Sequence, residues 1–173
     1  NIVAGVVRGQ IPYLPEHIER KRAIYERYRS GLAGLPVSMN PYDSTVSEPN
    51  FWLSCVLIDA EAMCRQVRSD SDALYTHEPG KTCPTEILET LAKYNAEGRP
   101  IWKPMHMQPI YRCSPFITRT GNGRARSNAY IAENDCVDIG AGIFSRGLCL
   151  PSDINMTEEQ QSIIIEIIRS CFE

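Results

Sequence analysis

The chain has 173 residues, the size of one domain, and 43% of them are hydrophobic while 23% are charged; this balance excludes a wholly disordered protein. Its 18 basic and 21 acidic residues leave a net charge of −3, which argues against a dedicated nucleic-acid-binding protein. The longest strongly apolar stretch, residues 163–168, contains Glu166 and is far too short to span a bilayer.

The amino-terminal part of the chain predicts helices followed by a strand. Residues 1–10 are apolar, have no capping residue before them and start with Asn rather than Met, so we expect the end of a helix in a piece cut from a longer protein. Residues 16–30 combine a narrow apolar stripe with interleaved acidic and basic side chains, typical of a helix with a solvated outer face. Residues 35–50, rich in Pro, Ser and Asn, predict a loop, and residues 51–59 predict the clearest strand of the chain.

The middle of the chain predicts irregular segments around one helix and one strand. Residues 60–82 are polar and indicate a surface excursion. Pro84 suits the first turn of a helix that ends before Gly98. Residues 99–103 predict a strand, and the prolines that follow it force an extended loop.

The carboxy-terminal part predicts a loop and two further helices. Residues 113–136 contain a Gly- and Arg-rich stretch that lacks the end of a phosphate-binding P-loop and favours a flexible surface loop. A short helix over 138–146 leads into a brief strand, LCL, at 148–150. Thr157 and Gln160 have the spacing of a capping box for the last helix. The order of elements predicts an α+β domain with a small, largely antiparallel sheet of about three strands, covered by helices on one face.

Cysteine and histidine spacing gives a metal site little support. The seven cysteines contain no C-x-x-C pair, and the three histidines lie far apart. His77 and Cys83 are the best remaining ligand candidates. We expect the cysteines to be free, mostly buried thiols in a reducing cytoplasm.

The most site-like segment begins at the predicted strand 99–103. Its members are Arg99, Trp102, Lys103, His106, Gln108 and Tyr111. They offer positive charge for a phosphate, an aromatic face for a base or sugar, and an imidazole for hydrogen bonding. The nearby prolines restrict the loop, so we expect His106 to be exposed on a pre-organised binding edge. The alternative, in which Trp102 belongs to the core and His106 caps a turn, stays open.

No complete active site can be assembled from these residues. There is no G-x-S-x-G motif. A catalytic lysine needs desolvation to lower its amine pKa, and Lys21, Lys81 and Lys93 lie in polar segments where we expect them to be exposed. Only Lys103 follows an apolar strand.

Two strings, GRPIWKPMHMQPIY at 98–111 and IFSRGLCLPSDINMTEEQ at 143–160, resemble the carboxy-terminal part of the DegT/DnrJ/EryC1/StrS family. These are pyridoxal-phosphate-dependent aminotransferases that act on nucleotide-linked keto-sugars, and the strings are most similar to members that make acetamido and amino sugars for bacterial glycans. The resemblance implies the small domain of an aspartate-aminotransferase-like fold at 36–173, with residues 1–35 as connecting helices from a large domain.

The resemblance implies that the cofactor lysine and the aspartate facing the pyridine nitrogen lie in that large domain. The chain itself would then hold no catalytic, cofactor-binding or metal-binding residue and would be inactive alone. It would supply a substrate-facing loop and part of a homodimer interface. The whole enzyme would be cytoplasmic and would move an amino group from glutamate to a keto-sugar, and we expect no nucleic acid or membrane partner. The implied substrate contacts are Arg99, Trp102, Lys103, His106 and Gln108.

Two other functions stay open. One is a non-enzymatic α+β module that binds a nucleotide-sugar or a partner protein. The other is a sugar dehydratase of the same family in which the cofactor lysine is replaced; the chain cannot exclude it, because the deciding position falls outside it.

Overall fold

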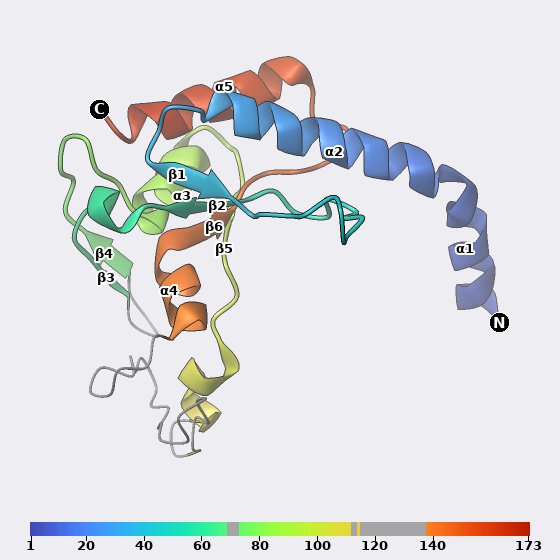
Figure 1. The fold of residues 1–173 in the computed structure, drawn as a ribbon, viewed down its shortest axis with the longest axis horizontal. Coiled ribbons are helices and arrows are strands. Elements are labelled where there is room, and N and C mark those ends of the chain that lie inside the picture. Colours follow the sequence, from blue (N-terminus) through green and yellow to red (C-terminus); the bar gives the residue numbers. More distant parts are fainter. Residues whose placement is uncertain (69–72, 112–113, 115–137) are drawn as a thin grey trace.

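A four-stranded antiparallel sheet lies at the centre of the molecule (Figure 1). The computed structural model describes residues 1–68, 73–111, 114 and 138–173. The strands lie in the spatial order β1 (Val37–Met39), β2 (Cys55–Ile58), β6 (Gly147–Cys149) and β5 (Arg99–Pro100). The α+β class is confirmed, and the sheet has one strand more than expected because β1 forms inside the predicted loop 35–50 and pairs with β2.

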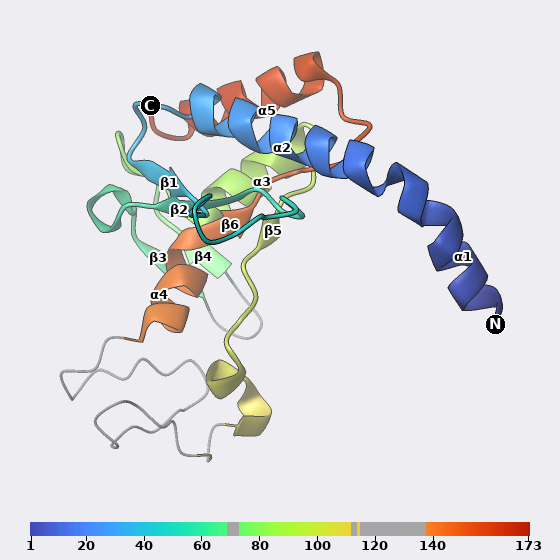
Figure 2. The ribbon, with the colours of Figure 1, turned by 45° about the vertical axis from the view of Figure 1, so that its right-hand side comes forward.

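Three helices cover one face of the sheet: α2 (Leu14–Gly31), α3 (Pro84–Lys93) and α5 (Glu158–Ser170). In both overall views α2 and α5 lie side by side above the strands (Figures 1 and 2). Alternate residues of the strands meet these helices in one core, since Val56, Ile58, Leu148 and Leu150 pack with Tyr28 and Ile168. Burial of these side chains supplies the main stabilising free energy of the fold.

Helix α1 (Ile2–Gln10) projects away from this body and has no buried residue (Figure 2). The expectation that it lacks a cap is wrong, because the Asn1 side chain accepts a hydrogen bond from the Val3 amide at 3.0 Å. A short 3₁₀ turn, Ile11–Tyr13, joins α1 to α2. None of the helices in the described ranges is long and apolar enough to cross a membrane.

The loops hold more structure than their composition predicts. The supposed excursion 60–82 contains a 3₁₀ turn, Ala60–Ala62, and an antiparallel pair of strands, β3 (Gln66–Arg68) and β4 (Ala73–Tyr75). The segment after β5, expected to be extended, forms two 3₁₀ turns, Met105–Met107 and Pro109–Tyr111. Proline favours the first position of such turns, which explains the difference at Pro109.

Helix α4 (Ile139–Arg146) runs directly into β6 and contacts β2 and β6. It matches the predicted short helix, and the Asp138 side chain caps it by accepting from the Ala141 amide at 2.9 Å. Most of the Gly- and Arg-rich stretch 113–136 lies outside the described residues.

The predicted capping box at the start of α5 is confirmed. Thr157 Oγ1 accepts from the Gln160 amide at 3.2 Å, and Gln160 Oε1 accepts from the Thr157 amide at 2.9 Å. We expect Thr157→Ala to lower the free energy of unfolding by about 1 kcal/mol. Urea denaturation measures this loss, with Thr76→Ala at an exposed position as the control; equal midpoints for the two variants would contradict it.

Candidate functional site

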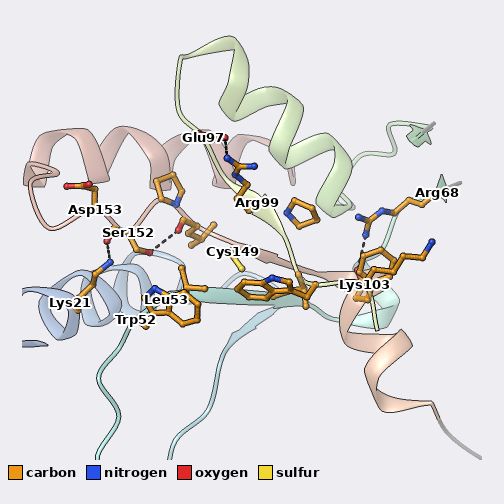
Figure 3. Close-up of a pocket in the computed structure, with 16 residues that line it drawn as sticks. Lys21, Trp52, Leu53, Arg68, Glu97, Arg99, Lys103, Cys149, Ser152 and Asp153 are labelled. Atoms are coloured by element: carbon orange, nitrogen blue, oxygen red, sulfur yellow. Dashed lines mark hydrogen bonds and ion pairs between the residues drawn. The ribbon is translucent and has the colours of Figure 1, made fainter. Parts of the chain in front are cut away.

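A pocket of about 790 Å³ lies where β5 and the segments flanking β2 and β6 meet α2 (Figure 3). This is within the usual size range of small-molecule sites. Four basic and two acidic side chains line it together with aromatic and apolar groups. The lining includes Lys21, Trp52, Arg68, Glu97, Arg99, Trp102, Lys103, Cys149, Ser152 and Asp153.

Two tryptophans form the aromatic part of the pocket. Trp52 and Trp102 are each 64% exposed, and their ring centroids lie 6.0 Å apart with the planes tilted by 36°. Large aromatic rings that stay in water are suited to stacking against a planar ligand or a sugar face.

The backbone before β2 explains why Trp52 remains exposed. Phe51 adopts a left-handed conformation with φ of 51°, a strained state for a bulky residue. This turn buries Phe51 against Tyr25 and Tyr42, at centroid distances of 5.2 and 5.3 Å, while Asn50 Oδ1 accepts from the Trp52 amide at 3.0 Å. The packing of Phe51 against Tyr25 of α2 and against Tyr42 therefore holds the adjacent tryptophan at the pocket.

Helix α2 also fixes one wall of the pocket. The hydroxyl of fully buried Tyr28 donates to the Pro151 carbonyl at 2.8 Å, and Lys21 Nζ donates to the Ser152 carbonyl. The expectation that Lys21 is an exposed lysine is wrong: its partial burial lowers the amine pKa, an effect that the nearby Asp153 carboxylate partly offsets. Figure 3 shows Lys21, Ser152 and Asp153 together at one end of the pocket.

The other basic side chains occupy the remainder of the pocket, with Arg68 and Lys103 at the opposite end (Figure 3). The Arg68 guanidinium lies 4.3 Å from the Phe144 ring centroid, and its Nη1 donates to the Phe144 carbonyl at 2.9 Å. Arg99 pairs with Glu97 at 2.6 Å on the exposed rim. Since basic groups outnumber acidic ones here, the pocket favours an anionic ligand.

The structure brings three of the five predicted site residues to this pocket: Arg99, Trp102 and Lys103. His106 and Gln108 do not line it. The Gln108 amide instead donates to the Lys103 carbonyl at 3.3 Å, so it braces the backbone that carries Lys103.

The expectation that His106 is exposed is wrong. Its side chain is 13% exposed, and Nε2 lies 2.5 Å from Oδ2 of Asp138, which is 7% exposed. Asp138 also caps α4, so this pair ties the loop after β5 to that helix. The sequence could not reveal this contact because the two residues are 32 positions apart.

The proposed metal ligands His77 and Cys83 are explained by other contacts. His77 Nδ1 lies 2.7 Å from Oε1 of the buried Glu86, whose other oxygen accepts from Thr82 Oγ1 at 2.8 Å. Cys83 is fully buried just before α3. Within the part of the chain that the structure describes, no group of three or more His, Cys, Asp or Glu residues is arranged to hold a metal ion.

Sequence reasoning missed Lys21, Trp52, Arg68 and Asp153 as pocket residues. Lys21 lies on a helix whose charges all look solvated, and Trp52 falls at the start of a predicted core strand. Arg68 lies in the supposed excursion. These residues meet at one site because tertiary packing brings together segments that are far apart in the sequence.

Comparison with known proteins agrees with this architecture. Residues 1–169 match the model of the DegT/DnrJ/EryC1/StrS aminotransferase family. The chain is 33% identical over 174 aligned residues to EpsN of Bacillus subtilis, provisionally named a pyridoxal phosphate-dependent aminotransferase; the match covers 99% of this chain and 36% of that protein. It is 24% identical over 172 residues to GDP-perosamine synthase of Vibrio cholerae, covering 99% of this chain and 37% of that protein.

A solved structure shows the same fold. Spr1654 of Streptococcus pneumoniae, provisionally a sugar aminotransferase, superposes with a TM-score of 0.65 at 18% identity over 94% of this chain and 32% of its own. The chain thus spans about a third of the length of the proteins it matches. Because the family model covers nearly every residue, the chain belongs to the DegT/DnrJ/EryC1/StrS family of pyridoxal-phosphate-dependent aminotransferases.

Proposed function

We propose that this chain acts as the small, substrate-recognising domain of a sugar aminotransferase. The whole enzyme would transfer an amino group from glutamate to a nucleotide-linked keto-sugar for a bacterial glycan. The pocket of about 790 Å³ is the observation that carries the proposal, because it combines two exposed tryptophans with basic side chains. The fold that carries this pocket is shared with aminotransferases.

The chemistry of the pocket suits both parts of such a substrate. The rings of Trp52 and Trp102 offer faces for a nucleobase or a sugar. Arg99 and Lys103 offer charged donors to a diphosphate. The name of the Vibrio cholerae relative, GDP-perosamine synthase, supports a nucleotide-linked sugar as the ligand.

His106 and Gln108 have a different role in this proposal from the one that the sequence suggests. The contact of His106 with the Asp138 carboxylate and the hydrogen bond from Gln108 to the Lys103 carbonyl hold the segment that carries Lys103 at the pocket. They are positioning residues, which act on the substrate through Lys103 and the backbone around it.

The residues of this pocket do not fit a pyridoxal phosphate site. The Lys21 amine is held by the Ser152 carbonyl, and Glu97 on the rim is paired with Arg99. Elsewhere Lys81 pairs with Glu78 at 3.2 Å. The cofactor lysine of the whole enzyme would therefore lie in the portion that the relatives carry beyond this chain.

This assignment predicts that the 173-residue chain alone forms no stable adduct with pyridoxal phosphate. Incubation with the cofactor, borohydride reduction and peptide mass spectrometry are expected to show no stoichiometric label on Lys21, Lys81, Lys93 or Lys103. A full label on Lys21 or Lys103, the two lysines that line the pocket, would contradict the assignment.

We further propose a homodimer in a reducing cytoplasm. The apolar side chains of α1, such as Ile2, Val3, Val6 and Val7, are exposed here, which suits a segment covered by other parts of the assembled enzyme. The five described cysteines are free thiols, which suits a reducing compartment.

Amino transfer by the full-length enzyme tests the proposed function. With glutamate and a nucleoside-diphosphate keto-sugar, mass spectrometry is expected to detect the amino-sugar nucleotide and 2-oxoglutarate in equal amounts. Loss of water from the sugar without amine incorporation would favour the dehydratase, and binding without turnover would favour a non-enzymatic module.

A further inference from the structure

Two cysteines face each other across the centre of the sheet. In the antiparallel register of β2 and β6, Cys55 lies directly opposite Cys149, and their Sγ atoms are 3.6 Å apart. The adjacent pair is joined by a hydrogen bond from the Leu150 amide to the Ser54 carbonyl at 2.8 Å. Because hydrogen-bonded and non-hydrogen-bonded pairs alternate in such ladders, Cys55 and Cys149 form a non-hydrogen-bonded pair.

This position has the backbone geometry that a disulfide needs. Residues in a non-hydrogen-bonded antiparallel pair have Cα atoms about 4.5 Å apart, within the range of about 4.4–6.8 Å found for disulfides. Since both side chains already lie on the same face of the sheet, small side-chain rotations bring the sulfurs to bonding distance without moving the strands. We propose that Cys55 and Cys149 form a reversible disulfide when hydrogen peroxide oxidises this protein.

Both thiols border space that a small oxidant can enter. Cys149 lines the pocket described above, and Cys55 lines a neighbouring cavity of about 140 Å³. Cys149 is 4% exposed, and Cys55 is more exposed. Hydrogen peroxide, little larger than water, reaches these positions more readily than a bulky thiol reagent does.

The two thiols of the pair differ in acidity. Their shared hydrogen bond lowers the pKa of Cys149, against the opposing effect of burial, and the same bond together with burial raises the pKa of Cys55. Cys149 is therefore the sulfur that reacts first with the oxidant, and Cys55 is the thiol that attacks afterwards. Cys64, which lies near Cys83, has the opposite environment: burial, the neighbouring thiol and the Glu86 carboxylate raise its pKa to about 12. We therefore expect Cys64 not to be the thiolate that attacks the peroxide first.

The reaction consumes one peroxide for each disulfide. The Cys149 thiolate attacks one oxygen of hydrogen peroxide, so that an S–O bond forms, the O–O bond breaks, and hydroxide leaves and takes up the thiol proton as water. The Cys55 sulfur then attacks this sulfenic acid, the S–S bond forms, the S–O bond breaks, and hydroxide leaves with the Cys55 proton. Two thiols are oxidised, the peroxide is reduced, and two waters result.

The bridge would join positions that are 94 residues apart in the chain. A cross-link over a long loop restricts the unfolded chain, so we expect the oxidised protein to melt about 5–10 °C above the reduced one. The increase requires a bond that the native strands accept without strain.

Peptide mapping of the oxidised protein tests the proposal. The protein is treated with hydrogen peroxide, alkylated, digested without reductant and analysed by mass spectrometry. We expect one linked pair of peptides that contain Cys55 and Cys149, which separate after reduction. Alkylation at both positions, stable sulfinic acid at Cys149, or a link between other cysteines would overturn the proposal.

Matched variants give a second readout. Cys55→Ser and Cys149→Ser should each abolish the oxidation-dependent rise in melting temperature. Cys171→Ser should retain it, because Cys171 follows α5, away from the sheet pair, and its thiol donates to the Ile167 carbonyl. If a variant does not fold, peptide mapping of the unsubstituted protein tests the proposal by itself. If the Cys55–Cys149 link forms completely but the melting temperature does not rise, the claim that the native strands accept the disulfide without strain is contradicted.

Discussion

Trp102→Ala in the full-length enzyme is expected to reduce kcat/KM for the nucleotide-linked keto-sugar by about tenfold to a hundredfold. Stacking of a base on an aromatic side chain contributes about 1–3 kcal/mol, and each 1.4 kcal/mol corresponds to about a tenfold change. Trp102 is 64% exposed, so its removal costs the core little. Steady-state kinetics with varied sugar nucleotide measure the loss, and the melting temperature should stay nearly constant.

The donor half-reaction provides an internal control. Glutamate has no ring to stack on Trp102, so the rate of that half-reaction should change far less. Tyr94→Ala is the matched variant, because Tyr94 is similarly exposed but lies outside this pocket. Equal losses in both half-reactions, or equal losses in both variants, would show that Trp102 does not contact the substrate.

His106→Ala is expected to lower the free energy of unfolding by about 2–4 kcal/mol. The substitution removes the imidazole that contacts the nearly buried Asp138 carboxylate, and leaving a buried polar group without its partner costs about 1–3 kcal/mol, with more for a charged group. Asp138 keeps its bond from the Ala141 amide, which places the expected loss toward the lower end of that range. Urea denaturation measures the change.

A double-mutant cycle separates the pair from other effects of the substitution. His106→Ala combined with Asp138→Ala should cost less than the sum of the two single changes, because neither side chain is then left without the other. His17→Ala, on a partly exposed face of α2, should change stability by less than about 0.5 kcal/mol. Unchanged stability of His106→Ala with a large loss of substrate affinity would instead support a direct substrate contact.

Local sequence signals predicted those parts of the fold that depend on neighbouring residues. The capping box at Thr157 and Pro84 in the first turn of α3 act within one helical turn, so their effect can be read from the sequence. Strand β1 could not be predicted in this way. It is three residues long, lies among residues typical of loops, and exists because it pairs with β2.

The candidate site was predictable to the extent that its residues are close in the chain. Arg99, Trp102 and Lys103 follow one another along β5 and the segment after it, and all three reach the pocket. Trp52 and Lys21 come from other elements, and Asp138 pairs with His106 from the far side of a long connection. Such contacts depend on tertiary packing, which local composition and periodicity do not encode.

Tryptophan fluorescence tests the central claim, that this pocket binds a nucleotide-linked sugar, most directly. The chain contains two tryptophans, and both line the pocket, so the emission of the 173-residue chain reports on this site alone. Titration with a nucleoside-diphosphate hexose is expected to give saturable quenching, weakened in Arg99→Ala and Lys103→Ala and absent with the free hexose. Emission that stays unchanged up to millimolar sugar nucleotide, in a chain shown to be folded by circular dichroism, would contradict the account.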